Sequence, residues 1–194
     1  MRYSAEHKQE TRSRILEAAA WIFRREGYYG SGIDGLAEAA GVTNGAFYGH
    51  FKSKGEAFQT IVQLGLEQLR LGIVDMKKKH GKRWIKRFVE FYLGPKRTCD
   101  LGQACALPSL SPEIVRADQD IRSTYEHELR RVIAEVASGL SEGTPNERTD
   151  AAIAMLALLA GGVTLARAVP DPQLSERIAI AVGHAALDLT SHRS

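Results

Sequence analysis

The sequence predicts an all-α protein, and three observations lead to that fold class. Apolar residues recur at helical spacing along the chain, as in residues 11–28, where Ile15, Ala19, Ile22 and Phe23 share one face. Alternating patterns typical of strands are nearly absent. Glycine and proline fall between the periodic segments, where turns are needed. We expect about nine helices.

Composition narrows the class of protein further. The 194 residues suffice for one large or two small domains, and 44% hydrophobic with 25% charged residues is typical of a soluble globular chain. The formal net charge of +3 is a weak hint of a polyanionic partner. Two cysteines, Cys99 and Cys105, have no zinc-site or disulfide-framework spacing, so we expect a reducing cytoplasm and no metal.

Neither the N-terminus nor the longest uncharged stretch suggests export or membrane insertion. The polar N-terminus has no apolar core of a secretory signal. The longest uncharged stretch, residues 151–166, is shorter than the roughly 20 residues that cross a bilayer. We therefore expect no membrane partner.

The stretch GSGIDG, residues 30–35, matches the G-x-G-x-x-G pattern of dinucleotide-binding loops. Such a loop follows a β-strand, whereas the segment before it here is an amphipathic helix, so we expect no cofactor. Ser31 is instead predicted to accept the backbone N–H of Asp34 and to begin a helix that Gly41 ends.

A second short helix follows at once, with Thr43 as its predicted N-cap. A helix, a glycine turn and a second helix form the helix-turn-helix arrangement of many DNA-binding proteins. Six apolar residues are expected to fix the angle between the two helices: Ile33, Leu36, Ala37, Ala40, Val42 and Phe47.

Residues beyond this motif also show helical periodicity. Ser53 and Glu56 form a predicted capping box at the start of a long helix. In chain order we expect a helix over 53–80, a helix over 82–94, an irregular region over 95–112, a long helix over 113–140, and two last helices over 147–169 and 173–190.

Residues 11–58 resemble the DNA-binding region of TetR-family transcriptional regulators. The resemblance rests on the patterns I-L-x-A-A-x-x-x-F, G-Y, L-A-x-x-A-G-V and F-Y-x-H-F-x-S-K in register. It implies a helix-turn-helix domain over 1–57, and a ligand-binding and dimerisation domain over 58–194. It also implies a non-enzymatic, cytoplasmic, prokaryotic repressor, which as a homodimer binds a palindromic operator and leaves it when a small molecule binds. Gly32 and Gly35 depart from the family, which usually has side chains there.

The second helix of the motif is expected to enter the major groove. Thr43, Asn44, Gly45 and Ala46 are placed for the bases, with Asn44 suited to adenine and the Ala46 methyl to thymine. The resemblance adds phosphate contacts: Arg12, Ser31, Tyr48, His50 and Lys54. Each of three has an alternative role. Tyr48 could pack against the first helix, His50 could be a cap or core residue, and Lys54 could simply be solvated.

Binding to two half-sites requires a dimer, and the last two helices are the predicted interface. The expected contact residues are Leu156, Leu159 and Val163 on one helix and Ile178, Val182, Ala186 and Leu189 on the other. Burial of the same residues within one subunit is the alternative.

Four aromatic residues, Trp84, Phe88, Phe91 and Tyr92, recur at helical spacing. They are either plain core or part of an effector cavity, which the family resemblance implies and which needs apolar walls with a few polar groups. The other predicted lining residues are Cys105, Leu107, Tyr125 and Met155.

Three further alternatives stay open. Cys105 is either a redox or electrophile sensor or an inert thiol. The chain as a whole could be an all-α enzyme, although no catalytic motif supports it, or an architectural DNA binder without ligand control. The basic run over residues 77–87 is either a second nucleic-acid patch or a solvated face that complements a helix dipole.

Overall fold

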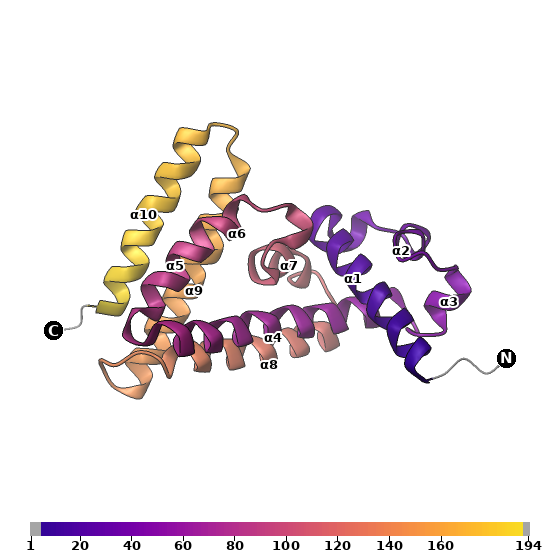
Figure 1. The fold of residues 1–194 in the computed structure, drawn as a ribbon, viewed down its shortest axis with the longest axis horizontal. Helices are drawn as coiled ribbons and strands as arrows, with labels where there is room; N and C mark the ends of the chain where they lie inside the picture. The colour runs from indigo at the N-terminus through magenta and orange to yellow at the C-terminus, as the bar shows by residue number, and fades with distance from the viewer. Residues whose placement is uncertain (1–4, 192–194) are drawn as a thin grey trace. The chain divides into compact units, whose positions relative to one another are not determined.

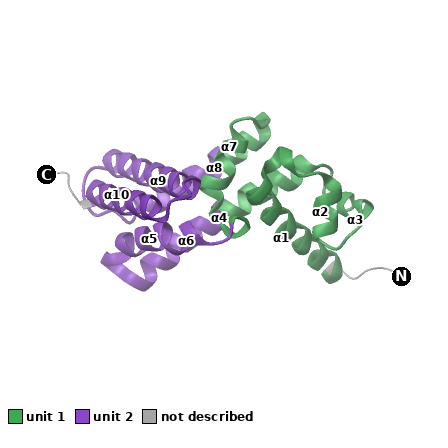
Figure 2. Cartoon of the chain, turned by 90° about the horizontal axis from the view of Figure 1, so that it is seen from above, with its two compact units in different colours: residues 1–65, 101–125 green, residues 66–100, 126–194 purple. Residues whose placement is uncertain are grey.

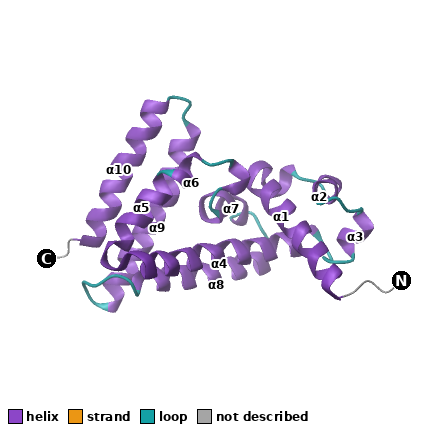
Figure 3. Ribbon diagram, in the orientation of Figure 1, coloured by secondary structure: helices purple, strands orange, loops and turns teal. Residues whose placement is uncertain are grey.

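The computed structural model describes residues 5–191, and within them it contains helices and no strand, which confirms the all-α prediction (Figure 3). Figure 1 shows the helices in chain order. They are α1 (Ala5–Gly30), α2 (Ile33–Ala39), α3 (Asn44–Tyr48), α4 (Lys54–His80), α5 (Trp84–Leu93), α6 (Pro95–Thr98), α7 (Ala106–Ile114), α8 (Gln119–Ala137), α9 (Pro145–Ala168) and α10 (Pro172–Ser191), with 3-10 turns η1 (Gly81–Arg83) and η2 (Leu101–Gln103).

The chain forms two compact units (Figure 2). Unit 1 combines Met1–Gly65 with Leu101–Tyr125, and unit 2 combines Leu66–Asp100 with Glu126–Ser194. Unit 1 therefore contains a segment from the middle of the chain as well as the N-terminal helices. The functional domain boundary after residue 57 stays a prediction.

The core of unit 1 forms around the apolar face of α1. Ile15, Ala19 and Phe23 are fully buried, as their spacing predicts, and the Phe23 ring meets the Phe58 ring edge-on at 5.1 Å. Helical geometry is interrupted at Gly27, whose φ of 79° lies in the left-handed region that glycine adopts without strain. Helix α1 is therefore kinked at Gly27 and ends one turn later, at Gly30.

Ser31 does not cap α2, so that prediction is wrong. Gly32 occupies the N-cap position without a side-chain hydrogen bond, while the Ser31 hydroxyl donates to the carbonyl of Gly27 at 3.1 Å. Ser31 is buried, and its hydroxyl satisfies a carbonyl at the end of α1 instead.

Residues 95–112 are more regular than expected, and the predicted long helix over 113–140 is broken. The prolines suggested a loop, but burial of Ala106, Leu107, Leu110 and Ile114 along one face stabilises α7. Helix α8 restarts where the Asp118 carboxylate accepts the backbone N–H of Ile121 at 3.1 Å.

In unit 2, α9 and α10 form an antiparallel pair and lie side by side (Figure 1). Gly162 lets α10 approach closely, because a Cβ there would lie 2.7 Å from a methyl group of Val182. Helix α5 contacts both, with Leu93 against Gly183. By length and composition α9 could cross a membrane, but a core helix of a soluble protein passes the same test.

Acidic and basic side chains of α4 and α8 form a ladder within unit 2. The Glu67 carboxylate accepts from Arg70 at 2.7 Å and pairs with Arg131 at 3.0 Å, while Glu135 pairs with both Arg70 and Lys77. The hydrogen bond from Arg70, with smaller contributions from Arg131, lowers the pKa of Glu67. The ladder thus joins the two helices by charge as well as by packing.

The lowered pKa of Glu67 predicts a pH dependence of stability. A carboxyl whose folded pKa lies below its unfolded pKa stabilises the fold above the unfolded pKa, about 4.3, and loses that contribution as pH falls through the folded pKa. We expect Glu67→Gln to lower the free energy of unfolding at pH 7 and to reduce its decline below about pH 4.3. Urea denaturation at several pH values measures this, and parallel wild-type and variant curves would contradict it.

Gly35 lies inside α2, where a Cβ would have no neighbouring atom within 4 Å. Alanine there costs no clash and loses less backbone entropy on folding. We expect Gly35→Ala to raise the free energy of unfolding by about 0.5–1 kcal/mol. Thermal denaturation measures this, and a lower midpoint would contradict the helical assignment of this glycine.

Candidate nucleic-acid interface

The turn between α2 and α3 follows directly from two residues. Gly41 has a φ of 64°, and its backbone N–H donates to the Glu38 carbonyl at 2.9 Å, which ends α2. The Thr43 hydroxyl then accepts the backbone N–H of Ala46 at 3.1 Å and begins α3. Both predictions, the glycine stop and the threonine cap, are confirmed.

Apolar packing fixes the position of α3 against α1 and α2. Leu36, Ala37 and Phe47 are buried in the core of unit 1, together with Ala40, and Phe51 lies beside Phe47 with ring centroids 5.6 Å apart. The predicted Ile33 and Val42 are partly buried against the same core. The short helix is therefore held by its apolar side, which leaves its other side to solvent.

The exposed side of α3 carries the residues that the sequence places on DNA bases. Thr43, Asn44, Gly45 and Tyr48 are exposed, and Ala46 is half-buried. The Asn44 amide donates to the Asp34 carboxylate at 2.5 Å, an interaction that the sequence did not predict. In this position Asp34 orients Asn44, and an adenine edge would have to compete for the same amide.

His50 follows α3 and is half-buried, with no hydrogen-bond partner for its Nδ1 atom in the described part of the chain. Burial, and to a lesser extent the charges of Lys8 and Arg12, lower the pKa of His50 below its ordinary value of 6.5. Burial therefore favours the neutral imidazole, and its Nδ1 atom is itself buried.

The two cations Lys54 and Arg12, which are predicted phosphate contacts, are engaged within unit 1. The Lys54 ammonium donates to the Ser31 carbonyl at 2.8 Å and lies 4.2 Å from the centre of the Tyr28 ring. The Arg12 guanidinium lies over the Phe51 ring at 4.8 Å. Their roles on DNA stay predictions, whereas their roles in joining α1, α2 and the start of α4 are visible.

The predicted effector residues divide between the two units. In unit 2, Trp84, Phe88 and Tyr92 on α5 are buried, and Phe91 on the same helix is 39% exposed. Met155 is also buried in unit 2. Binding of an effector by these residues stays a prediction.

In unit 1, Leu107 is buried and Cys105 is half-buried immediately before α7. The Tyr125 hydroxyl is 2.7 Å from the Ser111 hydroxyl, a contact that places two polar groups beside apolar Leu107 on α7. Binding of an effector by these residues stays a prediction, as does a sensing role of Cys105.

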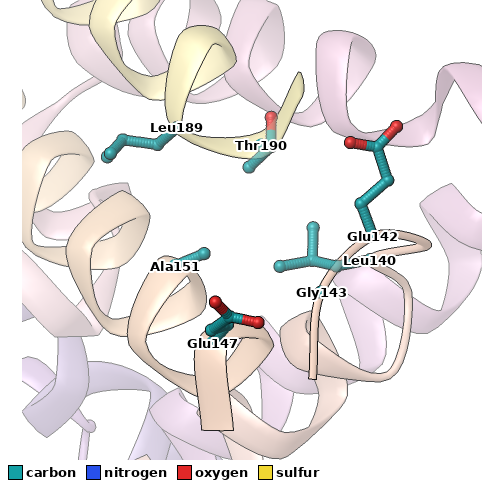
Figure 4. Close-up of a pocket in the computed structure, with 7 residues that line it drawn as sticks. All are labelled: Leu140, Glu142, Gly143, Glu147, Ala151, Leu189 and Thr190. Carbon is teal, nitrogen blue, oxygen red and sulfur yellow. The ribbon is translucent and has the colours of Figure 1, made fainter. Parts of the chain in front are cut away.

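A small pocket in unit 2 contains none of the predicted effector residues (Figure 4). Its apolar wall consists of Leu140, Ala151 and Leu189, and Glu147 and Thr190 contribute polar groups. The Glu147 carboxylate already accepts the backbone N–H of Thr144 at 2.8 Å in the cap of α9. This pocket is thus part of a helix cap and offers no free acid from Glu147.

Most predicted dimer contacts are buried within a single chain. Leu156, Leu159, Val163 and Ala186 are covered, and Ile178, Val182 and Leu189 are half-buried. The first four are not available as a contact surface, so the alternative of burial within one subunit holds for them.

Several exposed apolar or small residues of α9 and α10 are a different set, which we call the α9–α10 face. On α9 its members recur every four residues, a spacing that is visible in the sequence. The α9–α10 face comprises Ile153, Ala157, Gly161 and Leu165 on α9 and Leu174, Ala181 and Ala185 on α10.

A set of contacts that the sequence did not indicate joins α1 to the segment Leu101–Tyr125 in unit 1. The Trp21 side chain lies so close to Gly102 that a Cβ there would be 2.1 Å from the indole ring. Arg24 donates to the Gly102 carbonyl at 3.4 Å, and the Glu113 carboxylate accepts the Tyr28 backbone N–H at 3.2 Å. We call these contacts the α1–α7 junction.

Comparison with known proteins gives the same picture of the N-terminal region. Residues 15–61 match the family described as bacterial regulatory proteins, tetR family. The chain is 41% identical over 63 residues to the HTH-type transcriptional regulator AcrR of Shigella flexneri, which is 32% of this chain and 29% of that protein. The chain thus spans about three-tenths of the length of this relative, and the likeness lies in one region.

Solved structures extend the likeness to the whole fold. A TetR-family transcriptional regulator from Agrobacterium tumefaciens has a TM-score of 0.77 at 17% identity, covering 92% of this chain and 98% of that one. The regulator FadR from Bacillus subtilis, in complex with stearoyl-CoA, has a TM-score of 0.70 at 16% identity, covering 94% and 99%. At these identities the likeness concerns the fold.

Proposed function

We propose, from the match of residues 15–61 to the tetR family of bacterial regulatory proteins, that the chain is a DNA-binding transcriptional repressor of that family. It acts as a cytoplasmic homodimer and leaves a palindromic operator when a small molecule binds the C-terminal part of the chain. The names of its relatives, which are transcriptional regulators, favour this function over an all-α enzyme.

One observation carries the proposal, namely the exposed side of α3. Gly41 and Thr43 form the turn that separates α3 from α2, and buried Phe47 holds α3 in place. Asn44 and exposed Tyr48 therefore project from a fixed backbone, as sequence readout in the major groove requires.

The experiment that tests this function is a titration of labelled DNA from the region that flanks the protein's own gene. We expect a specific complex whose affinity falls as salt concentration rises, because phosphate contacts release counterions. Equal affinity for flanking and unrelated DNA would contradict the proposal. Transcription of the adjacent genes should rise when the protein is removed, whereas a fall would contradict the repressor assignment.

The α9–α10 face supports the dimer. Its residues are apolar or small and remain exposed in the single chain, and small residues let two helix pairs approach closely as a four-helix bundle. Burial of this face between two copies places two α3 helices in one complex, as a palindromic operator requires.

The effector is expected to be a mainly apolar small molecule, bound in the C-terminal part of the chain. Buried Trp84, Phe88 and Tyr92 in unit 2, and the Ser111–Tyr125 hydroxyl pair in unit 1, are the types of residue that line such sites. FadR, a protein of similar fold, is solved with stearoyl-CoA. Isothermal titration with candidate effectors, followed by their effect on the DNA complex, tests this part.

The α1–α7 junction offers a route from effector to DNA. Because α7 and α1 pack within one compact unit, a shift of α7 acts directly on the helix that supports α3. A ligand changes DNA affinity only when it binds one of two conformations of the protein more tightly than the other. We propose that these two conformations differ at the α1–α7 junction.

A further inference from the structure

A group of basic side chains lies where α4 ends and α5 begins, entirely within unit 2. Six of them are exposed, and we call this group the basic patch: Lys78, Lys79, Lys82, Arg83, Lys86 and Arg87. Lys77, which precedes them, differs because its ammonium pairs with Glu135 and donates to Ser138. The patch is therefore distinct from the ladder between α4 and α8.

Few acids balance this charge. Lys79 pairs with Asp75 at 2.8 Å and Arg87 with Glu90 at 2.9 Å, and both pairs are well exposed, so they contribute little. In the described residues, Lys78, Lys82, Arg83 and Lys86 form no ion pair. The patch thus keeps most of its positive charge free.

Helix dipoles explain only part of the patch. Lys78 and Lys79 lie in the last turn of α4, where positive charge is favourable. Lys82 and Arg83 precede α5 and Lys86 lies in its first turn, where positive charge is unfavourable and no acidic residue is present. Stability of the folded chain therefore gives no reason for these three charges.

The surroundings of the patch indicate the chemistry of a partner. Apolar Trp84 and Phe88 are buried, and over residues 72–100 the one large hydrophobic side chain that is exposed is Phe91, which by itself is no apolar face to insert into a bilayer. Four of the six residues are lysines, which protein interfaces disfavour. Closely spaced phosphates are the anions that lysine-rich surfaces of this kind contact without a fitted pocket.

From these observations we infer that the basic patch binds the phosphate backbone of duplex DNA, independently of α3 and without sequence preference. Each cation that contacts a phosphate releases counterions, so binding at the patch is strong at low salt and weakens steeply as salt rises. The protein thereby has a second DNA-binding surface, in unit 2, in addition to the operator-reading surface of unit 1.

The test uses the full chain and a labelled duplex of unrelated sequence, titrated by fluorescence anisotropy at several salt concentrations. The patch variant is Lys82→Gln, Arg83→Gln and Lys86→Gln. The control variant, Arg122→Gln, Arg130→Gln and Arg148→Gln, removes the same number of positive charges from elsewhere. Circular dichroism verifies that both variants keep the helical content of the wild type.

We expect the patch variant to lose about tenfold or more in affinity near 50 mM salt and about 2–3 in the slope of log affinity against log salt, since each phosphate contact contributes about 0.9. The control variant should stay within about twofold of the wild type. Equal losses in both variants would overturn the proposal, because net charge alone would then explain them.

The measurement is repeated in chains that also carry Asn44→Ala and Tyr48→Ala. The patch variant should lose the same factor in this background, since the two surfaces are independent. If these α3 changes have no effect on any DNA while the patch variant does, the proposed function fails and the patch stands. Patch-dependent binding to phosphatidylserine vesicles with none to DNA would overturn the patch proposal.

Discussion

Gly161→Arg is expected to convert the proposed dimer to a monomer and to lower operator affinity by about 100-fold or more, because linkage of two binding modules contributes about 10²–10⁴. Gly161 is exposed at the centre of the α9 stripe, and a Cβ there would have no atom within 4 Å. Arginine therefore fits the single chain, and its helix propensity is also higher than that of glycine. Between two copies, however, its charge would be buried without a partner.

The matched control for this prediction is Gly72→Arg. Gly72 is also an exposed glycine inside a long helix with open space around it, but it lies on α4 and outside the α9–α10 face. Light scattering coupled to size exclusion measures the mass of each variant, and DNA titration measures affinity. A dimeric Gly161→Arg protein would contradict the assignment of this face.

Gly102→Ala is expected to lower the free energy of unfolding by about 1–3 kcal/mol, the usual cost of overpacking. A methyl group there would lie 2.1 Å from the Trp21 ring, so the indole must leave its position over η2. Since Trp21 lies on α1, which supports α3, we also expect weaker operator binding and a reduced response to the effector.

Gly30→Ala serves as the control for the junction. It lies in the same unit, at the end of α1, and a Cβ there would make an ordinary contact of 3.7 Å with Glu26. Urea denaturation compares the two variants. Equal free energies of unfolding would show that the close approach of Trp21 to Gly102 does not contribute to stability. That result would contradict the role proposed for the α1–α7 junction.

The local features of the candidate site were predictable from sequence. Gly41 and Thr43 act within three residues of themselves, so a left-handed turn and a side-chain cap could be predicted without knowledge of the rest of the fold. The buried spacing of Ile15, Ala19 and Phe23 is equally local, since one helical period defines it.

Features that depend on distant parts of the chain were not predictable in this way. Serine is a preferred N-cap residue, but the Ser31 hydroxyl donates to the Gly27 carbonyl instead. Proline suggested a loop over residues 95–112, whereas tertiary burial of one apolar face stabilises α7 despite Pro112. Apolar stripes on α9 could be found from spacing, but which stripe faces solvent depends on the packing of α10 and α5.

DNA readout by α3 is the central property proposed for this protein, and one measurement tests it directly. The ratio of affinities for operator and unrelated DNA is compared between the wild type and the variant Asn44→Ala with Tyr48→Ala, with Gln63→Ala as an exposed-amide control in the same unit. We expect the double variant to lose operator affinity by about 100-fold, since the Asn44 base contact contributes about 1–3 kcal/mol and loss of the Tyr48 phosphate contact adds to it, and we expect the control to keep its affinity. A double variant that binds the operator as tightly as the wild type would contradict the claim.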